Sequence, residues 1–201
     1  MKRLNHSRKE QRGFTLLELV VVISVLVALA ALLVPALDSV MDDAKVAETA
    51  TLYDTLKKAC TQHYLDTSRY AHEYTGARYV QPNHHELAQE QTYAGWRGPY
   101  LEDSLGTENN PWKGNIHLYN YLLVNGLPGW DLDRDGNYEF TTQDRACVLW
   151  MTSVSEASAE ALDEAMDRGD LGSGVDWRQA GRLQWSSASG GTIWMLVFRN
   201  S

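Results

Sequence analysis

The residues best suited to chemistry form one short acidic run, Asp-Leu-Asp-Arg-Asp-Gly-Asn-Tyr-Glu, at positions 131–139. Oxygen-bearing side chains stand at alternating positions, and Gly136 permits the sharp turn that would bring them together. Hard cations such as Ca²⁺ prefer oxygen ligands, and the spacing matches the first nine positions of a calcium-binding loop. We therefore expect a structural Ca²⁺ ion here. The expected ligands are Asp131, Asp133, Asp135, Asn137 and Glu139.

The match to a calcium loop stops before its last ligand. The twelfth position is Thr142, where such a loop normally carries a glutamate that closes the site with two oxygens. Asp144, two residues later, is a weaker candidate for that role. The alternative is a solvated acidic turn, whose carboxylates would repel one another in the absence of a cation.

The cysteines and histidines are the other residues that could do chemistry. Cys60 and Cys147 are the two cysteines of the chain, and in an oxidising compartment they form either a disulfide or two separate buried thiols. No pair of histidines has a metal-ligand spacing together with a third ligand. The sequence also lacks the common nucleophile, phosphate-loop and dinucleotide motifs, so we expect no enzymatic activity.

The chain contains a continuous apolar run from Phe14 to Leu37, which would anchor the segments carrying these residues to a membrane. As an α-helix its 24 residues span ~36 Å, which is enough to cross a bilayer core of ~30 Å. Glu18 is the one ionisable residue in this run. A carboxylate in hydrocarbon costs on the order of 2 to 3 kcal/mol, so it is usually retained where it has a partner. The run predicts a transmembrane helix with a functional carboxylate near its start.

Residues 13–18, Gly-Phe-Thr-Leu-Leu-Glu, follow a basic leader and resemble the type III signal of type IV pilins and of type II secretion pseudopilins. The resemblance implies that a prepilin peptidase removes residues 1–13 by cutting between Gly13 and Phe14 and then methylates the amine of Phe14. Glu18 would pair with that amine, in the same subunit or in a neighbour, and so direct assembly. The alternative is an ordinary signal anchor that carries an incidental glutamate.

Charge separates the leader from the rest of the chain. The net charge of the chain is −8 at pH 7. The leader through Gly13 has five Lys or Arg and one Glu, a net charge of +4, so the remainder of the chain carries −12. Positive charge beside a membrane helix stays in the cytoplasm. We therefore expect a single-pass protein of the bacterial inner membrane with a cytoplasmic N-terminus and a periplasmic head. The acidic remainder disfavours a nucleic-acid partner.

Together with the pattern beyond the membrane, the resemblance to pilins implies an α+β, pilin-like fold, in which a long N-terminal helix packs on an antiparallel sheet. Residues 14–37 are its transmembrane half and residues 38–66 its amphipathic half, because apolar side chains recur there every three or four positions. These side chains are Val46, Ala50, Tyr53, Leu56, Cys60 and Tyr64. Residues 67–201 form the globular head.

Within the head, four segments predict strands and two predict helices. Residues 115–124 and 146–152 are predicted to be strands, and 181–187 with 192–198 to form a closing hairpin. Between them, Ser153 and Glu156 have the spacing of a capping box for a helix, on which Asp163 is expected to face solvent. A second short helix is expected at residues 83–90.

Residues 95–101, Gly-Trp-Arg-Gly-Pro-Tyr-Leu, and 110–114, Asn-Pro-Trp-Lys-Gly, resemble a loop of the major, G-type pseudopilin of type II secretion. The resemblance implies a structural subunit of a pseudopilus that supports protein secretion. Its partners would be further copies or other pseudopilins, a prepilin peptidase and an inner-membrane assembly platform. Such subunits commonly hold a structural Ca²⁺ in their C-terminal loops, although this chain has a longer C-terminal tail than the typical one.

Two alternatives belong to other functional classes. One is a type IV pilin of a surface fibre, used for adhesion, motility or DNA uptake. The other is a membrane-anchored calcium-binding module that never polymerises.

Overall fold

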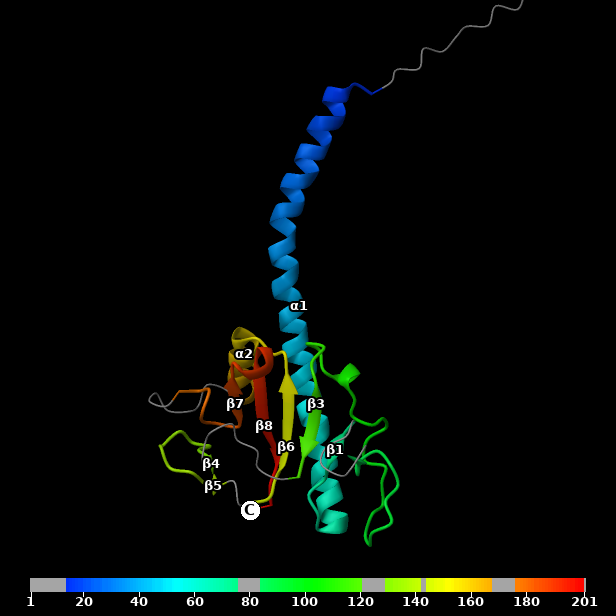
Figure 1. The fold of residues 1–201 in the computed structure, drawn as a ribbon, viewed down its shortest axis with the longest axis vertical. Helices are drawn as coiled ribbons and strands as arrows, with labels where there is room; N and C mark the ends of the chain where they lie inside the picture. Colours follow the sequence, from blue (N-terminus) through cyan, green and yellow to red (C-terminus); the bar gives the residue numbers. More distant parts are fainter. Residues whose placement is uncertain (1–13, 76–83, 121–128, 142–143, 168–175, 201) are drawn as a thin grey trace, which may run out of the picture. The chain divides into compact units, whose positions relative to one another are not determined.

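The structure is a computed structural model that describes residues 14–75, 84–120, 129–141, 144–167 and 176–200 (Figure 1). The predicted leader, Gly13, Thr142 and the segment 121–128 lie outside the described residues. Residues up to Met41 and residues 42–201 form two compact units, and the second, which we call the head unit, holds the folded core.

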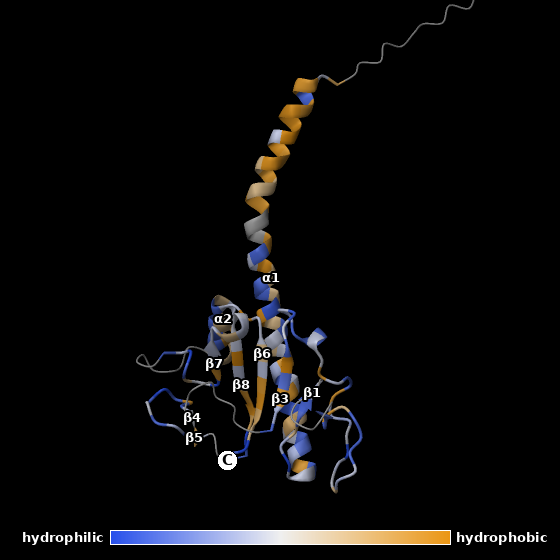
Figure 2. Ribbon diagram, in the orientation of Figure 1, coloured by the Kyte–Doolittle hydropathy of each residue, from blue (hydrophilic) through white to orange (hydrophobic). Residues whose placement is uncertain are grey.

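One helix, α1, occupies Leu16–Thr67 and so belongs to both units. Its length confirms the prediction of a single long N-terminal helix, and it continues past Pro35. The part before Met41 is apolar and the part after it is mixed, as the colours of Figure 2 make clear. In the head unit the predicted stripe is buried where the sheet lies, because Tyr53, Leu56 and Cys60 are all less than 7% exposed.

The head unit contains a six-stranded antiparallel sheet in the order β2-β1-β3-β6-β8-β7 (Figure 1). The two central strands β6 and β8 are the longest of the sheet. A separate two-stranded hairpin joins β4 to β5. The strands are β1 (Glu73–Tyr74), β2 (His84–His85), β3 (Ile116–Tyr119), β4 (Gly129–Trp130), β5 (Phe140–Thr141), β6 (Cys147–Thr152), β7 (Leu183–Ser186) and β8 (Thr192–Phe198). The helix α2 is Glu156–Asp167, and two 3-10 turns are η1 (Thr107–Asn109) and η2 (Ala188–Gly190).

Alternation along the central strands produces two apolar clusters, one on each face of the sheet. Leu149 of β6 and Met195 of β8 lie in the larger cluster, together with Leu56 and Cys60 of α1. The neighbouring residues Val148, Trp150, Trp194 and Leu196 belong to the smaller cluster, which includes Trp130 of the β4–β5 hairpin. The sheet is therefore covered by α1 on one face and by this hairpin on the other.

Two local predictions were wrong. Residues 83–90 do not form a helix in the described part, because His84 and His85 form strand β2 and a turn follows. The helix α2 is capped by Ser155 and not by Ser153: the Ser155 hydroxyl accepts a hydrogen bond from the Ser158 amide at 3.2 Å. Ser153 has a φ of 67°, so its backbone lies in the left-handed region. The helix itself begins at Glu156, so only the identity of the capping serine differs from the prediction.

Candidate functional site

The first candidate site is the N-terminal turn of α1, where Glu18 folds back onto Thr15. One carboxylate oxygen of Glu18 accepts hydrogen bonds from the Thr15 amide at 2.8 Å and from the Thr15 hydroxyl at 2.9 Å. The Glu18 amide in turn donates to the Thr15 hydroxyl at 3.2 Å. This reciprocal pair satisfies amides that a helix N-terminus leaves without partners. Glu18 therefore lies beside the backbone of the residue that follows Phe14.

The apolar half of α1 makes no core with the rest of the described chain. Every residue from 14 to 33 is exposed, and large aliphatic side chains such as Leu16, Leu19 and Leu26 are more than half exposed. By length and composition the helix can cross a membrane. An apolar surface of this size needs lipid or other helices as its surroundings, because water solvates it poorly.

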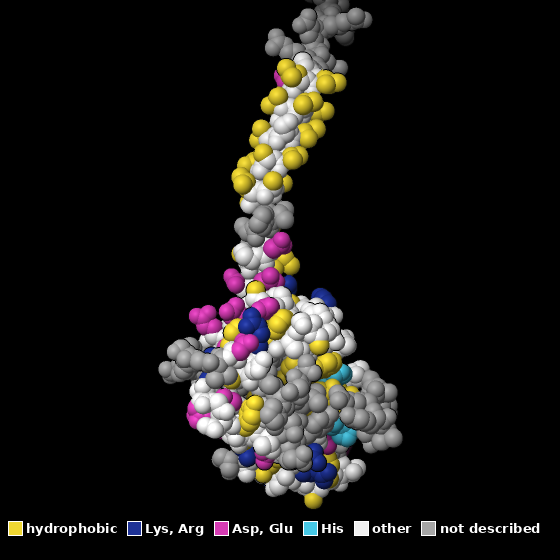
Figure 3. All heavy atoms as spheres, turned by 60° about the vertical axis from the view of Figure 1, so that its left-hand side comes forward, with side chains coloured by type: hydrophobic (Ala, Val, Ile, Leu, Met, Phe, Trp, Pro, Cys, Tyr) yellow, Lys and Arg dark blue, Asp and Glu magenta, His cyan; other side chains and the backbone are white. Residues whose placement is uncertain are grey.

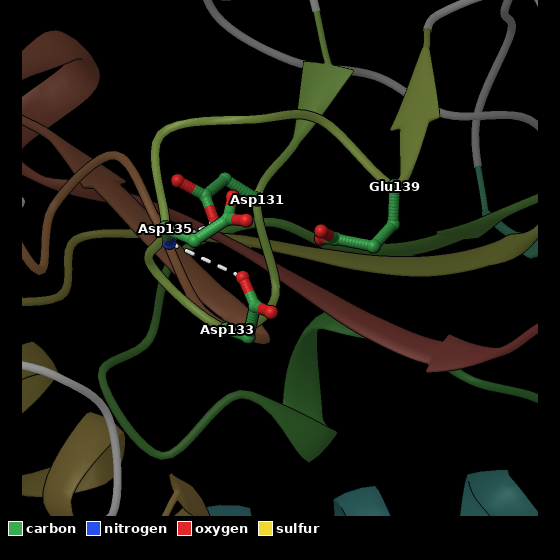
Figure 4. A group of neighbouring side chains, drawn as sticks. All are labelled: Asp131, Asp133, Asp135 and Glu139. Carbon is green, nitrogen blue, oxygen red and sulfur yellow. Dashed lines mark hydrogen bonds between the residues drawn. The ribbon is translucent and has the colours of Figure 1, made fainter.

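The second candidate site is the acidic loop 131–139, which connects β4 to β5 (Figure 4). Four carboxylates, those of Asp131, Asp133, Asp135 and Glu139, can each present an oxygen so that all four oxygens lie within 4.8 Å of one another. Asp131 is buried, whereas the other three are exposed. Figure 4 shows Glu139 reaching toward the three aspartates from the other side of the loop.

The backbone of the acidic loop holds the aspartates in place. The Asp131 carboxylate accepts hydrogen bonds from the amides of Asp135 at 3.2 Å and Gly136 at 2.9 Å. Gly136 has a φ of 90°, a value that a residue with a side chain rarely adopts. Hydrogen bonds from the side chain and amide of Asn137 hold the pKa of the Asp135 carboxyl below its usual value. The Asp135 carboxylate therefore stays ionised, and the loop holds the four carboxylates close together, as a divalent cation requires.

Two of the residues expected to ligate the ion are placed differently. Asn137 turns its amide group to the Asp135 carboxylate, at 3.0 Å. Asp144 does not join the four carboxylates: it accepts from the Thr141 amide at 2.8 Å and lies 3.7 Å from Arg199. The structure thus supports four of the six expected ligands as one group.

An ion pair that the sequence analysis missed anchors the acidic loop to α2. Arg134 donates to Asp163 at 2.6 Å, and the side chains of both residues are about nine-tenths buried. The expectation that Asp163 faces solvent was therefore wrong. No sequence signal could have found the pair, because 29 positions separate its members and each residue type is common on surfaces.

Comparison with known proteins locates the similarity in the N-terminal part of the chain. Residues 8–34 match the family described as the prokaryotic N-terminal methylation motif. Two type IV major pilin proteins PilE1 of Neisseria gonorrhoeae are each 36% identical to this chain over 72 residues, which is 36% of this chain. This chain is type IV pilin-like. The match spans 44% and 40% of the two relatives, less than half of their length. No solved structure matches the chain.

The matched relatives are pilins, which are structural proteins and not enzymes, and the motif and the apolar helix fit a membrane-anchored protein.

The loop that resembled G-type pseudopilins packs in this pilin-like chain against the end of α1. The Trp96 indole donates to the Glu86 carbonyl at 2.8 Å, and the Tyr100 hydroxyl donates to Asp66 at 3.0 Å. Gly95 lies so close that an added Cβ would stand 2.2 Å from the Asp66 carbonyl oxygen.

The cysteines of the pilin-like chain lie side by side within the core that joins α1 to β6. Both are buried thiols in the structure, and burial, together with the neighbouring Cys147, raises the pKa of Cys60. The Cys147 thiol also approaches the Ala71 carbonyl oxygen at 3.8 Å. The fold thus brings together the two cysteines, for which the sequence left a disulfide and two buried thiols as alternatives, and in the structure they are thiols.

The histidines of the pilin-like chain form no metal site among the described residues. Adjacent His84 and His85 point in opposite directions, as expected: His84 contacts Glu86 at 3.1 Å and His85 contacts Glu73 at 2.7 Å. His63 is buried between the Arg69 carbonyl and the Tyr93 hydroxyl. Burial lowers the pKa of His63, so this ring is neutral at pH 7. These contacts are structural.

Proposed function

We propose that this chain is a subunit of a filament, cut between Gly13 and Phe14, methylated on Phe14 and polymerised through the apolar half of α1. The observation that carries the proposal is the methylation motif at residues 8–34, which overlaps an apolar helix that no other described residue covers. A helix that is apolar all round suits both lipid and a bundle of like helices. One stretch can therefore anchor the subunit before assembly and form the filament core afterwards.

Glu18 has a defined task in this proposal. Its carboxylate already accepts the amide and hydroxyl of Thr15, the residue next to the new N-terminus. Cleavage would create an amine on Phe14, and in a low-dielectric bundle a carboxylate and an amine attract each other strongly. Pairing with the amine of a neighbour would set the axial register of the subunits.

The first test combines processing and assembly. Intact mass measurement of protein co-expressed with a prepilin peptidase should give the loss of residues 1–13 and one added methyl group. Glu18→Ala should remain in the membrane, because it removes a charge from the apolar helix, yet its filament yield should fall at least about tenfold, the loss expected from ~1.4 kcal/mol per contact. Ser24→Ala is a matched control, because Ser24 bonds only its own helix, at the Val20 carbonyl.

An unprocessed N-terminus in the presence of active peptidase would contradict the proposal and would favour a membrane-anchored module that never polymerises. Normal filaments in Glu18→Ala would contradict the role of Glu18 alone.

We further propose that the filament is a type II secretion pseudopilus, assembled with other pseudopilins on an inner-membrane platform, with the head in the periplasm. The similarity of the loop 95–101 to that of G-type subunits supports this choice, and the loop's packing on α1 gives it a structural role. The relatives that are major pilins favour the alternative, a surface fibre. Deletion of the gene should therefore reduce protein secretion and leave surface fibres intact. The reverse pattern would identify a pilus.

We propose finally that the acidic loop binds a structural Ca²⁺ ion. The four converging carboxylates support this proposal, because they would otherwise repel one another across less than 5 Å. An ion that binds only the folded chain stabilises it by about 2.7 kcal/mol at a hundred times its dissociation constant. Adding Ca²⁺ to chelator-treated protein should therefore raise its melting temperature by several degrees. Mg²⁺ should do less, because it requires stricter octahedral geometry.

Two substitutions make the calcium experiment specific. Asp133→Asn removes one of the four converging carboxylates and should abolish most of the thermal shift. Asp144→Asn removes a partly exposed carboxylate that lies outside the group, and the shift should persist. Equal thermal shifts in both variants would show that Ca²⁺ acts through general charge screening and would exclude the loop as its site.

A further inference from the structure

A basic pocket in the head unit is the feature that the proposed function leaves unexplained. It encloses about 250 Å³ beside α1 and β8. Three cationic side chains line it: Lys57 of α1, Arg182, and Arg199 at the end of β8. Its apolar wall includes Tyr53, Phe140 and Phe198. All of these residues belong to the same compact unit.

The positive charge of this pocket contrasts with the rest of the molecule, whose residues after Gly13 carry a net charge of −12. Lys57 has no ion pair among the side chains that the structure describes, and it is exposed. The Arg199 guanidinium lies 3.5 Å from the ring centre of Phe140 and has only a long, half-exposed contact of 3.7 Å with Asp144. An exposed contact of this kind contributes little. The pocket therefore retains positive charge for an anionic occupant.

An acidic patch, opposite in charge to the basic pocket, lies on α1 at the point where this helix enters the head unit. Asp42, Asp43 and Glu48 are exposed there, and Lys45, which pairs with Asp42, is the one basic residue between positions 42 and 56. Glu48 also lines a second pocket, of about 410 Å³, together with Glu108. Figure 3 shows acidic side chains gathered where α1 enters the head unit, with Lys and Arg side chains among them.

The basic pocket and the acidic patch cannot meet within one subunit. Fourteen residues of continuous helix separate Asp43 from Lys57, which is ~21 Å at a rise of 1.5 Å per residue. Salt weakens attraction between exposed charges beyond ~8 to 10 Å, so the two surfaces barely interact inside the chain. Two complementary surfaces set well apart on the head unit form a head-to-tail contact between copies, and such a contact propagates into an open helical array when its rotation does not close.

We propose that the basic pocket of one subunit receives the acidic segment 42–48 of a second copy. The inference rests on the proposed filament, because it describes a contact between neighbouring subunits. Carboxylates of the acidic segment approach Lys57 and Arg199, and the aromatic wall of the pocket excludes water from the contact. Complementary charge of this kind fixes register and partner choice more than it adds affinity.

Cysteine cross-linking tests the contact directly. The full-length double variant Asp43→Cys with Arg199→Cys is assembled under reducing conditions, and the sheared filaments are then oxidised. Head-to-tail contact should give a ladder of covalent multimers on a non-reducing gel, whereas each single variant should not. Glu164→Cys on the exposed face of α2, combined with Arg199→Cys, is the matched control and should give no ladder. The native cysteines do not interfere, because both are buried.

Charge reversal gives an independent measurement. Lys57→Glu changes an exposed side chain that has no ion pair among the described residues, so the head should fold normally while filament yield falls roughly tenfold at physiological salt. Adding Asp43→Lys should restore the yield in part. Filaments that form normally without a ladder and without an effect of Lys57→Glu would overturn this inference and leave the filament proposal standing. Failure of the wild-type chain to form filaments would overturn both.

Discussion

At the scale of single residues, Glu73 organises more of the head than any other buried carboxylate among the described residues. It is fully buried in β1 and accepts hydrogen bonds from the His85 ring at 2.7 Å and from the amides of Leu87 and Ala88 at 2.5 and 3.1 Å. These amides follow β2, where no strand or helix satisfies them. The Glu73 carboxylate therefore accepts the backbone hydrogen bonds that a strand or helix would otherwise accept from this segment.

The pKa of Glu73 predicts how the head responds to pH. Burial raises this pKa above its ordinary value of 4.5, and the hydrogen bonds from His85 and Leu87 offset part of the increase. The folded state therefore holds the proton more tightly than the unfolded state. The resulting stabilisation is complete below pH 4.5 and is lost as pH rises through the raised pKa.

Glu73→Gln should remove this pH dependence, because the amide oxygen still accepts a backbone amide but carries no titrating proton. Relative to wild type, the melting temperature of Glu73→Gln should fall less as pH rises from 4.5. Glu73→Ala should cost roughly 2 to 4 kcal/mol at every pH, since it leaves two buried amides without partners. Glu102→Gln is the control, because Glu102 is exposed. Parallel pH curves for Glu73→Gln and wild type would rule out the titration of Glu73.

At the scale of elements, the sequence predicts helices and strands that a local pattern defines, and it misses those that depend on residues far apart in the chain. The stripe on α1 follows from a spacing of three to four residues, β6 from a continuous apolar run, and β7 with β8 from alternation around a turn. The strands β1 and β2 have two residues each, too few for a period to appear. Their pairing is supported by Glu73, whose partners are 12 to 15 positions away.

The same distinction applies to the candidate sites. The converging carboxylates of the acidic loop were predictable, because nine consecutive residues contain all four of them. The Arg134–Asp163 pair and the basic pocket were not, because α1, α2, the β4–β5 hairpin and β8 supply their residues from distant parts of the chain. A charged residue in a sequence is normally predicted to be exposed to solvent, because most charged side chains are exposed.

At the scale of the whole molecule, the division into two compact units separates folding from assembly. All the buried core residues come from position 53 onward, so the head unit contains the whole core that the structure describes. The described side chains at positions 14–33 and 37–41 are exposed and contribute nothing to that core. The head should therefore fold without the apolar half of α1, whereas polymerisation should require it.

A chain of residues 42–201 tests this separation. It should be soluble, unfold in one cooperative thermal transition and elute as a monomer at micromolar concentration. A dissociation constant of 1 μM requires about 8 kcal/mol, whereas exposed ion pairs such as those proposed for the basic pocket supply less than about 1 kcal/mol each. The pocket contact can set register only after the apolar helices have brought the subunits together. Filaments formed by residues 42–201 alone would show that the head drives assembly, and the apolar helix would then be a membrane anchor only.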